Sequence, residues 1–388
     1  MKVNMKNIQI ILQKINKAPT RIFSILAGMG LILGIITDFK FEPTEQNKGL
    51  WFVIFILLWL LISVSVEFLF YAFNRIKIKL IAATKPAAIP ITDSLVAYFE
   101  ELKRQNNSDE LIIRWGLGVS KPLWVSHSYQ ILKNIGQIVF ESAKKSNDEK
   151  AQIYVLINNI GWTNVELLEY SDAITNIKEG ITLLNKENNR DYYLLAKAHR
   201  HLVSINIRTD NMDKKEECEI HLKLCEEATN NYIESWKETT NTYELNKQNR
   251  LRAEFNFTKA TYEHKSGNND KALSFINEAE ELFAKIPNKD WKVKIMARKG
   301  DILLALNRDK EALDSFNKGK DISIRATLNK PLVKNLIGLG NYFIKQGEYK
   351  NAKDNLELAL TKANEIGMYY EIEIIEKKLK IVDNKMKK

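Results

Sequence analysis

The sequence is short of the residues that interrupt helices or cross-link small folds. Its 388 residues include 7 prolines, 16 glycines and 2 cysteines. This composition excludes a collagen-like chain and differs from that of disordered segments, which are rich in proline. Cys218 and Cys225 lie seven residues apart on one expected helix. Seven helical residues rise ~10 Å, which is too far for a disulfide bond, so we expect two small buried thiols in a reducing compartment.

Motifs for catalysis and metal binding are also missing. The sequence contains neither G-x-S-x-G nor H-E-x-x-H, and residues 116–121 lack the glycine spacing of a phosphate-binding loop. Its 5 histidines are scattered, and no cysteines stand beside them at the spacing of a zinc site. We therefore predict that the protein is not an enzyme and that it binds no cofactor and no metal.

Positive charge is unevenly spread along the chain. The net charge is +10, but residues 1–85 contain 11 Lys or Arg against 4 Asp or Glu, and the remaining 303 residues contain 47 against 44. The excess therefore lies beside the apolar segments of the N-terminal region, where cytoplasmic flanks carry it. Because the rest of the chain has no block of like charge, we expect no nucleic-acid partner.

Two apolar runs stand out in residues 1–82, at about residues 22–39 and 50–73. The second is ~36 Å long as a helix and crosses a bilayer with some tilt, and the first can span one if Arg21 extends toward the headgroups. No small-x-small cleavage pattern follows the first run, which favours an uncleaved anchor over a signal peptide. We predict a transmembrane helical hairpin whose partner is the lipid bilayer.

The flanking charges predict the orientation of this hairpin. Nine basic residues flank the outer ends of the two runs, whereas the connecting loop contains Lys40 and Lys48 beside three acidic residues. Because basic flanks stay in the cytoplasm, we predict a multi-pass protein of a bacterial inner membrane with both termini cytoplasmic. Residues 3–17 have the pattern of a basic amphipathic helix on the inner leaflet.

Four residues of the predicted hairpin are candidates for packing or function. Ala27, Gly30 and Gly34 share one helical face, and small residues let helices approach closely in lipid. This face is either the seam within the hairpin or the contact surface of a homo-oligomer. Glu67 lies in the second run, where an ionisable side chain is either functional or close enough to the boundary to reach water.

Beyond the hairpin the pattern is helical throughout, so we predict an all-α protein. Pro86 and Pro90 interrupt the helical pattern and mark a linker at residues 83–91. No later segment shows sustained alternation of β-branched residues. Residues 92–149 read as a helical cap or a degenerate repeat, in which Pro122 is expected to end the first helix.

Internal repetition is clearest in residues 333–366, where small and large residues recur on two expected helices. The pattern consists of Leu336, Leu339, Gly340 and Phe343, then Gly347 at the turn, then Tyr349, Ala352, Leu356 and Ala359. These residues resemble the tetratricopeptide repeat (TPR) consensus. The resemblance implies an α-solenoid over residues 150–388, which ends in a capping helix at residues 369–382.

The same frame fits residues 154–187, 199–232, 253–286 and 293–326. The small residues at the helix crossing are Ala173, Cys218, Ala272, Ala312 and Ala352. Their spacings are 45, 54, 40 and 40 residues, compared with about 34 in the usual repeat. The array therefore resembles the longer-repeat type, with long helices or inserted loops.

The resemblance to TPR proteins implies a binding groove lined by the first helix of each repeat. The positions that match this lining are Asn158, Trp162, Arg200, Ser204, Thr261, Lys294, Arg298, Asp301 and Asn341. Lys294 and Arg298 are four residues apart, which suits a clamp on an acidic group. The carboxylate clamp of chaperone adaptors is not reproduced across adjacent repeats.

These features favour a scaffold or adaptor that recruits a protein or peptide partner to the cytoplasmic face of the membrane. A second hypothesis is a sensor–effector of the bacterial defence type. In that case the repeats would sense a ligand or partner, and the hairpin would oligomerise and perturb the membrane.

Overall fold

The computed structural model describes residues 89–104, 108–186, 190–209, 214–286 and 288–387. Thr92–Lys388 form one compact unit. Both predicted transmembrane helices lie outside the described residues, and so do Ala27, Gly30, Gly34 and Glu67. Within the described ranges, no helix combines the length and the apolar character that crossing a bilayer requires.

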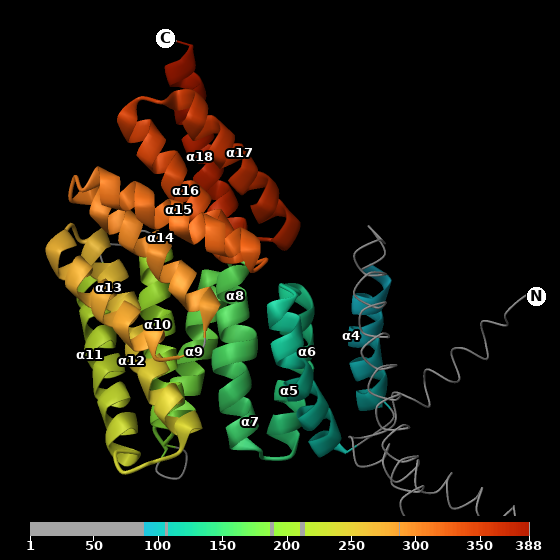
Figure 1. Cartoon of the computed structure of the whole chain (residues 1–388). Helices are drawn as coiled ribbons and strands as arrows, with labels where there is room; N and C mark the ends of the chain where they lie inside the picture. The colour runs from blue at the N-terminus through green and yellow to red at the C-terminus, as the bar shows by residue number, and fades with distance from the viewer. Residues whose placement is uncertain (1–88, 105–107, 187–189, 210–213, 287, 388) are drawn as a thin grey trace, which may run out of the picture. The chain divides into compact units, whose positions relative to one another are not determined.

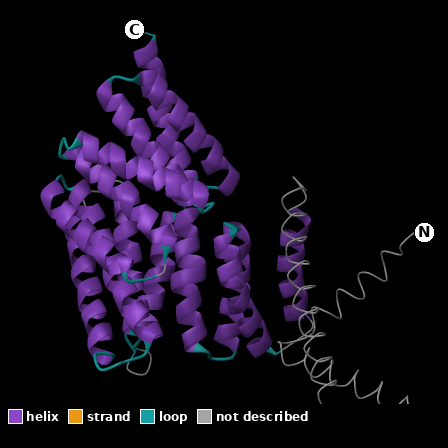
Figure 2. Ribbon diagram, in the orientation of Figure 1, coloured by secondary structure: helices purple, strands orange, loops and turns teal. Residues whose placement is uncertain are grey.

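The described part of the chain contains helices and turns and no strand (Figure 2), which confirms the all-α class. The helices are α4 (Ile89–Arg104), α5 (Asp109–Val125), α6 (Tyr129–Lys145), α7 (Glu149–Tyr154), the π-helix η2 (Val155–Gly161), α8 (Trp162–Glu166), α9 (Tyr170–Leu184), α10 (Tyr192–Arg208), α11 (Lys215–Ser235), α12 (Thr242–Lys265), α13 (Asn269–Ala284), α14 (Lys289–Ala305), α15 (Asp309–Arg325), α16 (Asn329–Gln346), α17 (Tyr349–Ile366) and α18 (Tyr369–Met386). Because α7, η2 and α8 run on without a turn, they act as one long helix.

Successive helices pack as pairs, and the pairs stack into a TPR-like solenoid (Figure 1). The pairs α10–α11, α12–α13, α14–α15 and α16–α17 coincide with the frames expected from the sequence, as does α7–η2–α8 with α9. Many of the turns contain one residue with positive φ, such as Gly347 at φ 77° after α16. This left-handed residue closes the helix end and reverses the chain.

Small residues sit where paired helices cross, as the repeat pattern predicts. Ala173, Ala272, Ala312 and Ala352 are completely buried. A Cβ atom added to Gly340 of α16 would lie 2.7 Å from the side chain of Leu356 on α17. The close approach of the two helices therefore depends on the absence of side chains at these positions.

The two cysteines occupy crossing positions on α11 and are buried and unbonded to each other, as expected. The Cys225 thiol donates to the carbonyl of Ala196 on α10 at 3.2 Å. Burial raises the pKa of Cys225 to about 12, so this thiol is not a nucleophile near neutral pH.

Long helices explain the wide repeat spacing. Helix α11 has 21 residues and α12 has 24, and these two helices account for the largest step between crossing positions, from Cys218 to Ala272. Long helices, one of the two alternatives that the sequence left open, therefore account for this step.

The prediction that Pro122 ends a helix was wrong, and Pro90 also lies within a helix. Helix α4 begins at Ile89, so Pro90 lies in its first turn. A proline is tolerated there because the first-turn N–H groups have no acceptor within the helix. Pro122 lies inside α5, which continues to Val125. Leu123 is buried in this last turn, and we attribute the persistence of the helix beyond the proline to that packing.

A basic inner face as the candidate functional site

The first helices of successive pairs form a common inner face: α10 neighbours α12, α12 neighbours α14, and α14 neighbours α16. Charged side chains of these helices, of α8 and of α18 interact with one another across this face. The basic ones are Lys197, Arg200, Arg208, Arg250, Lys294, Arg298, Lys330 and Lys334, and the acidic ones are Glu166, Glu254, Asp290, Asp301 and Glu371.

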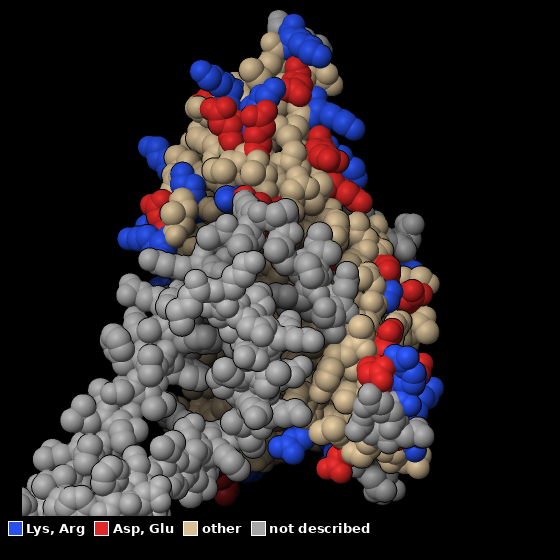
Figure 3. Space-filling view, turned by 90° about the vertical axis from the view of Figure 1, so that its right-hand side faces the viewer, with Lys and Arg blue, Asp and Glu red and all other residues tan. Residues whose placement is uncertain are grey.

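The inner face is thus richer in basic than in acidic groups. The face drawn in Figure 3 differs, because basic and acidic side chains alternate over its C-terminal end. A surplus of positive charge is typical of a face that receives an anionic ligand.

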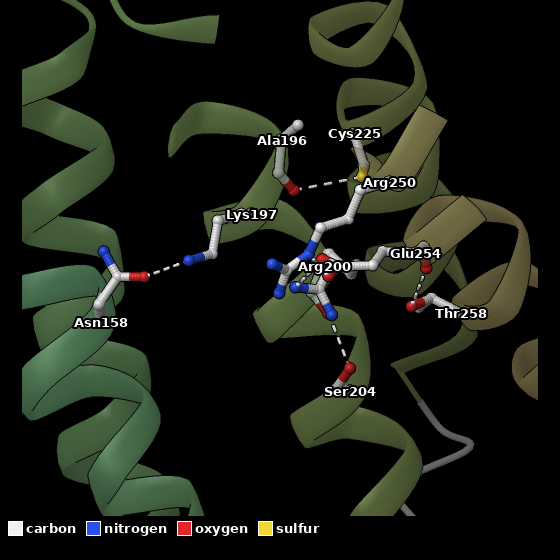
Figure 4. Close-up of polar contacts among 9 residues, drawn as sticks. All are labelled: Asn158, Ala196, Lys197, Arg200, Ser204, Cys225, Arg250, Glu254 and Thr258. Carbon is white, nitrogen blue, oxygen red and sulfur yellow. Dashed lines mark hydrogen bonds and ion pairs between the residues drawn. The ribbon is translucent and has the colours of Figure 1, made fainter. Parts of the chain in front are cut away.

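Four side chains of α10 and α12 form the first part of this face, which we call the α10–α12 cluster: Lys197, Arg200, Arg250 and Glu254 (Figure 4). The Glu254 side chain is 3% exposed. Arg200 Nη2 lies 2.9 Å from Glu254 Oε2, and Arg250 Nε donates to Glu254 Oε1 at 2.7 Å. Burial opposes the charge of Glu254, but the two guanidinium groups outweigh it and lower the pKa of this carboxyl.

Lys197 extends away from this pair, toward the preceding first helix (Figure 4). Its ammonium donates to the side-chain oxygen of Asn158 on η2. Burial lowers the pKa of Lys197 to about 8, although Glu254 opposes the shift. The cluster therefore holds three basic groups and one carboxylate, and the buried Nε of Arg200 has no hydrogen-bond partner.

Helical periodicity explains why these side chains share a face. Lys197, Arg200 and Ser204 follow one stripe of α10, while Leu202 and Ile205 on other sides of the helix are buried. The side chain of Asp191 caps the N-terminus of α10 by accepting from the backbone N–H of Leu194 at 3.0 Å. This cap and the packed side hold the basic stripe in place.

The π-helical turn η2 contributes the neighbouring wall. Asn158 meets Lys197, and the next residue, Asn159, donates to Ser120 Oγ on α5 at 2.7 Å. A π-helical turn adds a residue to the turn and so redirects side chains locally. Here the two adjacent asparagines bond in different directions, Asn158 to α10 and Asn159 to α5.

A second group of charges, the Glu166 cluster, connects the early and late helices of the array. Glu166 ends α8 and is 9% exposed. Arg208 of α10 donates to Glu166 Oε1 at 3.1 Å, and Lys330 of α16 donates to Oε2 at 3.0 Å. Burial opposes the charge of Glu166, yet Lys330 and Arg208 outweigh it and lower its pKa.

Aromatic rings complete the Glu166 cluster. The Lys330 ammonium lies 5.2 Å and 4.8 Å from the ring centroids of Trp124 and Tyr129. The Arg208 guanidinium lies 5.3 Å from the ring centroids of both Trp162 and Tyr370. Such cation–π contacts strengthen when they are removed from water, so this cluster joins α5, α6, α8 and α10 to α16 and α18.

The residues predicted to line the groove differ in what they contact. Arg200 belongs to the α10–α12 cluster, and Asn158 accepts a hydrogen bond from Lys197 of that cluster. Trp162 stacks on His201 with ring centroids 4.2 Å apart. The Ser204 hydroxyl donates to the backbone carbonyl of Arg200 at 2.9 Å. The Thr261 hydroxyl likewise donates within its own helix, to the carbonyl of Phe257 at 2.8 Å.

The predicted clamp on α14 differs from expectation. Lys294 pairs with Asp290, and Arg298 lies 3.4 Å from Asp301. Each of these two basic residues therefore has an acidic partner on its own helix, four residues away for Lys294 and three for Arg298. Side chains at these spacings are neighbours on a helix surface. These two residues make a weaker anion site than the α10–α12 cluster. The last predicted residue, Asn341, is partly buried on α16.

Sequence reasoning missed Lys197, Arg250 and Glu254, and also the partners of Glu166. One signal was available for Glu254, which stands between Ala253 and Phe255 in a largely apolar run. A carboxylate inside such a run is buried and needs a partner. Its partner Arg200 lies 54 residues earlier in the chain, and no periodic pattern connects the two.

No known family profile matches the chain, and no curated protein matches it. Several solved structures are similar. A signal transduction ATPase with a tetratricopeptide repeat sensor from Pyrococcus horikoshii has 16% identity over 77% of this chain, with a TM-score of 0.47, and this chain spans 44% of that protein. A Rap protein complexed with competence and sporulation factor has 15% identity over 75% of this chain and 80% of its own, with a TM-score of 0.48. A tetratricopeptide repeat protein from Parabacteroides merdae has 16% identity over 75% of this chain and 98% of its own, with a TM-score of 0.41.

Proposed function

We propose that this chain is a binding protein without catalytic activity, and that its TPR-like array holds a protein or peptide partner on the inner face. The observation that carries the proposal is the surplus of basic groups on that face, above all in the α10–α12 cluster. Buried charge without a counter-charge lowers stability, and binding sites are where such costs are retained.

Site-specific crosslinking tests this proposal. A photoreactive amino acid placed at Asn341 would report on the inner face, and one at Lys223, whose side chain is 79% exposed on α11, would report on the outer side. We expect a protein or peptide adduct from the inner position and none from the outer one. Adducts of equal yield at both positions, or at neither, would contradict the proposal.

We further propose that the array is held at a membrane by the apolar runs at residues 22–39 and 50–73. This part of the proposal is supported by sequence alone: by the lengths of the runs and by the basic residues that flank them. The expected result is that the full chain stays with membranes after alkaline extraction, while a chain lacking residues 1–82 is released. Release of the full chain would exclude an integral anchor.

A further inference from the structure

The α10–α12 cluster lacks the negative charge that would balance it. Lys197, Arg200 and Arg250 share the single carboxylate of Glu254. Among the described residues nearby, Asp191 is engaged in capping α10, and Asp290 pairs with Lys294. Two of the three positive charges therefore have no buried counter-charge.

The hydrogen-bonding capacity of the cluster is not fully used. The Arg200 guanidinium uses Nη2 toward Glu254, and its Nε is buried without a partner. The Lys197 ammonium has three N–H groups and meets the neutral side-chain oxygen of Asn158. Residues three apart on a helix are neighbours on its surface. The two side chains therefore leave α10 from neighbouring positions, and from there Lys197 extends to Asn158 and Arg200 to Glu254 (Figure 4).

From these donors we propose that Lys197 and Arg200 form a carboxylate-recognition subsite, which seats an acidic side chain of a partner peptide with support from Arg250. This inference rests on the proposed function and specifies the chemistry of its ligand. The incoming carboxylate accepts hydrogen bonds from the lysine ammonium and pairs with the arginine guanidinium, and it supplies one of the two missing negative charges.

Glu254 favours a carboxylate over a phosphate in this seat. It already occupies one side of Arg200 and Arg250 with a full negative charge. A singly charged carboxylate adds one negative charge near Glu254, whereas a doubly charged phosphate at the same place meets a stronger repulsion from Glu254. Recognition is therefore directed to Asp or Glu.

Defined peptide pools test the subsite. Fluorescently labelled hexapeptide pools would be prepared with a fixed third residue, which is glutamate, glutamine, lysine or phosphoserine, and would be titrated with the full-length chain in detergent micelles. We expect the glutamate pool to bind roughly tenfold more tightly than the glutamine pool, and this preference to disappear in Lys197→Met and Arg200→Gln. Arg252→Gln is the matched control, because Arg252 lies on α12 but bonds to Asn230 of α11.

The subsite would be wrong if the chain bound the glutamate and glutamine pools with equal affinity, or if it clearly preferred the phosphoserine pool. It would also be wrong if the chain bound free succinate but none of the peptide pools. Melting temperatures of the variants separate lost recognition from lost folding, and Lys197→Met is expected to melt no lower than the wild type. If crosslinking from Asn341 persists while the pools show no acidic preference, the subsite is wrong and the binding face stands. Loss of the crosslink itself would contradict the proposed function.

Discussion

Lys197 and Glu254 illustrate two ways in which a folded chain accommodates a charge away from water. Glu254 is bonded by two guanidinium groups, which lower its pKa and keep it ionised. Lys197 meets a neutral amide oxygen, and burial lowers its pKa to about 8. The first arrangement is self-sufficient, whereas the second is less stable in the absence of a ligand.

The lysine gives a prediction about pH. The pKa of Lys197 is lowered to about 8 in the folded chain from the ordinary 10.5. The charged lysine therefore lowers the free energy of unfolding by its full amount below the folded-state pKa. This effect fades as the pH rises from the folded-state pKa toward the unfolded-state pKa. We expect Lys197→Met to be more stable than the wild type by about 1–3 kcal/mol near pH 7, and by less near pH 9.5. Urea unfolding at both pH values measures this difference.

Lys223→Met is the control for this experiment, because that lysine is 79% exposed. We expect no pH-dependent difference from the wild type for it. A Lys197→Met variant that is less stable than the wild type at neutral pH would show that the charge is well compensated, and would remove the physical basis of the subsite.

Sequence reasoning identified part of this site. Arg200 and Asn158 were predicted because they match first-helix positions of the repeat pattern. Lys197 and Arg250 lie on the same faces but matched no signature position. The bond between Arg200 and Glu254 depends on how α10 stacks on α12, and a single sequence contains no record of that stacking.

At the scale of the helices, close stacking depends on glycine positions, where no side chain separates the helices. The Phe316 ring of α15 inserts between α14 and α16, where a Cβ atom on Gly300 or Gly338 would lie 2.4 Å or 2.2 Å from it. These distances are shorter than van der Waals contact, so the ring fits only because both helices have glycine there. The pattern of small residues is the reason that the helix pairs could be located from the sequence.

Gly338→Ala should therefore destabilise the array by about 1–3 kcal/mol, because the ring or the helix must move to admit the methyl group. Gly118→Ala is the matched control, since Gly118 also lies within a helix but has no atom within 4 Å of the added Cβ. We expect that control to be stabilising by up to ~1 kcal/mol through helix propensity. Thermal unfolding of the two variants compares them directly, and equal effects would contradict the packing argument.

Other features of the helices were not predictable from periodicity. The π-helical turn at η2 interrupts a helix whose apolar pattern is otherwise regular. Pro122 remains within α5, and the lost hydrogen bond is tolerated beside the buried Leu123. At Pro122 tertiary packing outweighs the local preference of the chain.

At the scale of the whole described unit, the Glu166 cluster joins parts that the repeat pattern keeps separate. Glu166 and Lys330 are 164 residues apart in sequence and 3.0 Å apart in space. Contacts between successive repeats arise from a repeating pattern and are therefore foreseeable. The contact between distant repeats depends on the accumulated curvature of the array, which small rotations at every pair determine, and the sequence did not reveal it.

Removing the central carboxylate should have a large effect. Glu166→Gln leaves Arg208 and Lys330 without their buried counter-charge, and we expect a loss of about 3–5 kcal/mol near pH 7. The pKa of Glu166 is lower in the folded chain than in the unfolded chain. The ionised Glu166 therefore stabilises the folded chain fully above the unfolded-state pKa of about 4.3, and this stabilisation is lost as the pH falls through the folded-state pKa. The gap between variant and wild type should therefore narrow in acid.

Urea unfolding near pH 7 and near pH 3 measures this change. Glu227→Gln is the control, since Glu227 is 54% exposed and lies 4.0 Å from Lys223 on the surface of α11. A constant gap between Glu166→Gln and the wild type at both pH values would show that the charge of Glu166 contributes nothing to stability.

The Glu166 cluster also constrains the order in which the chain acquires its structure. Most helix contacts here are local in sequence and can form as each pair leaves the ribosome, which favours rapid folding. Glu166 and Arg208 are synthesised long before Lys330, and they must wait exposed until α16 emerges. The contact between α8 and α16 can therefore form only late in synthesis. A chain stalled before α16 would have folded helix pairs in which the charges of Glu166 and Arg208 are open to water. Quality-control proteases can distinguish such a chain from the finished protein.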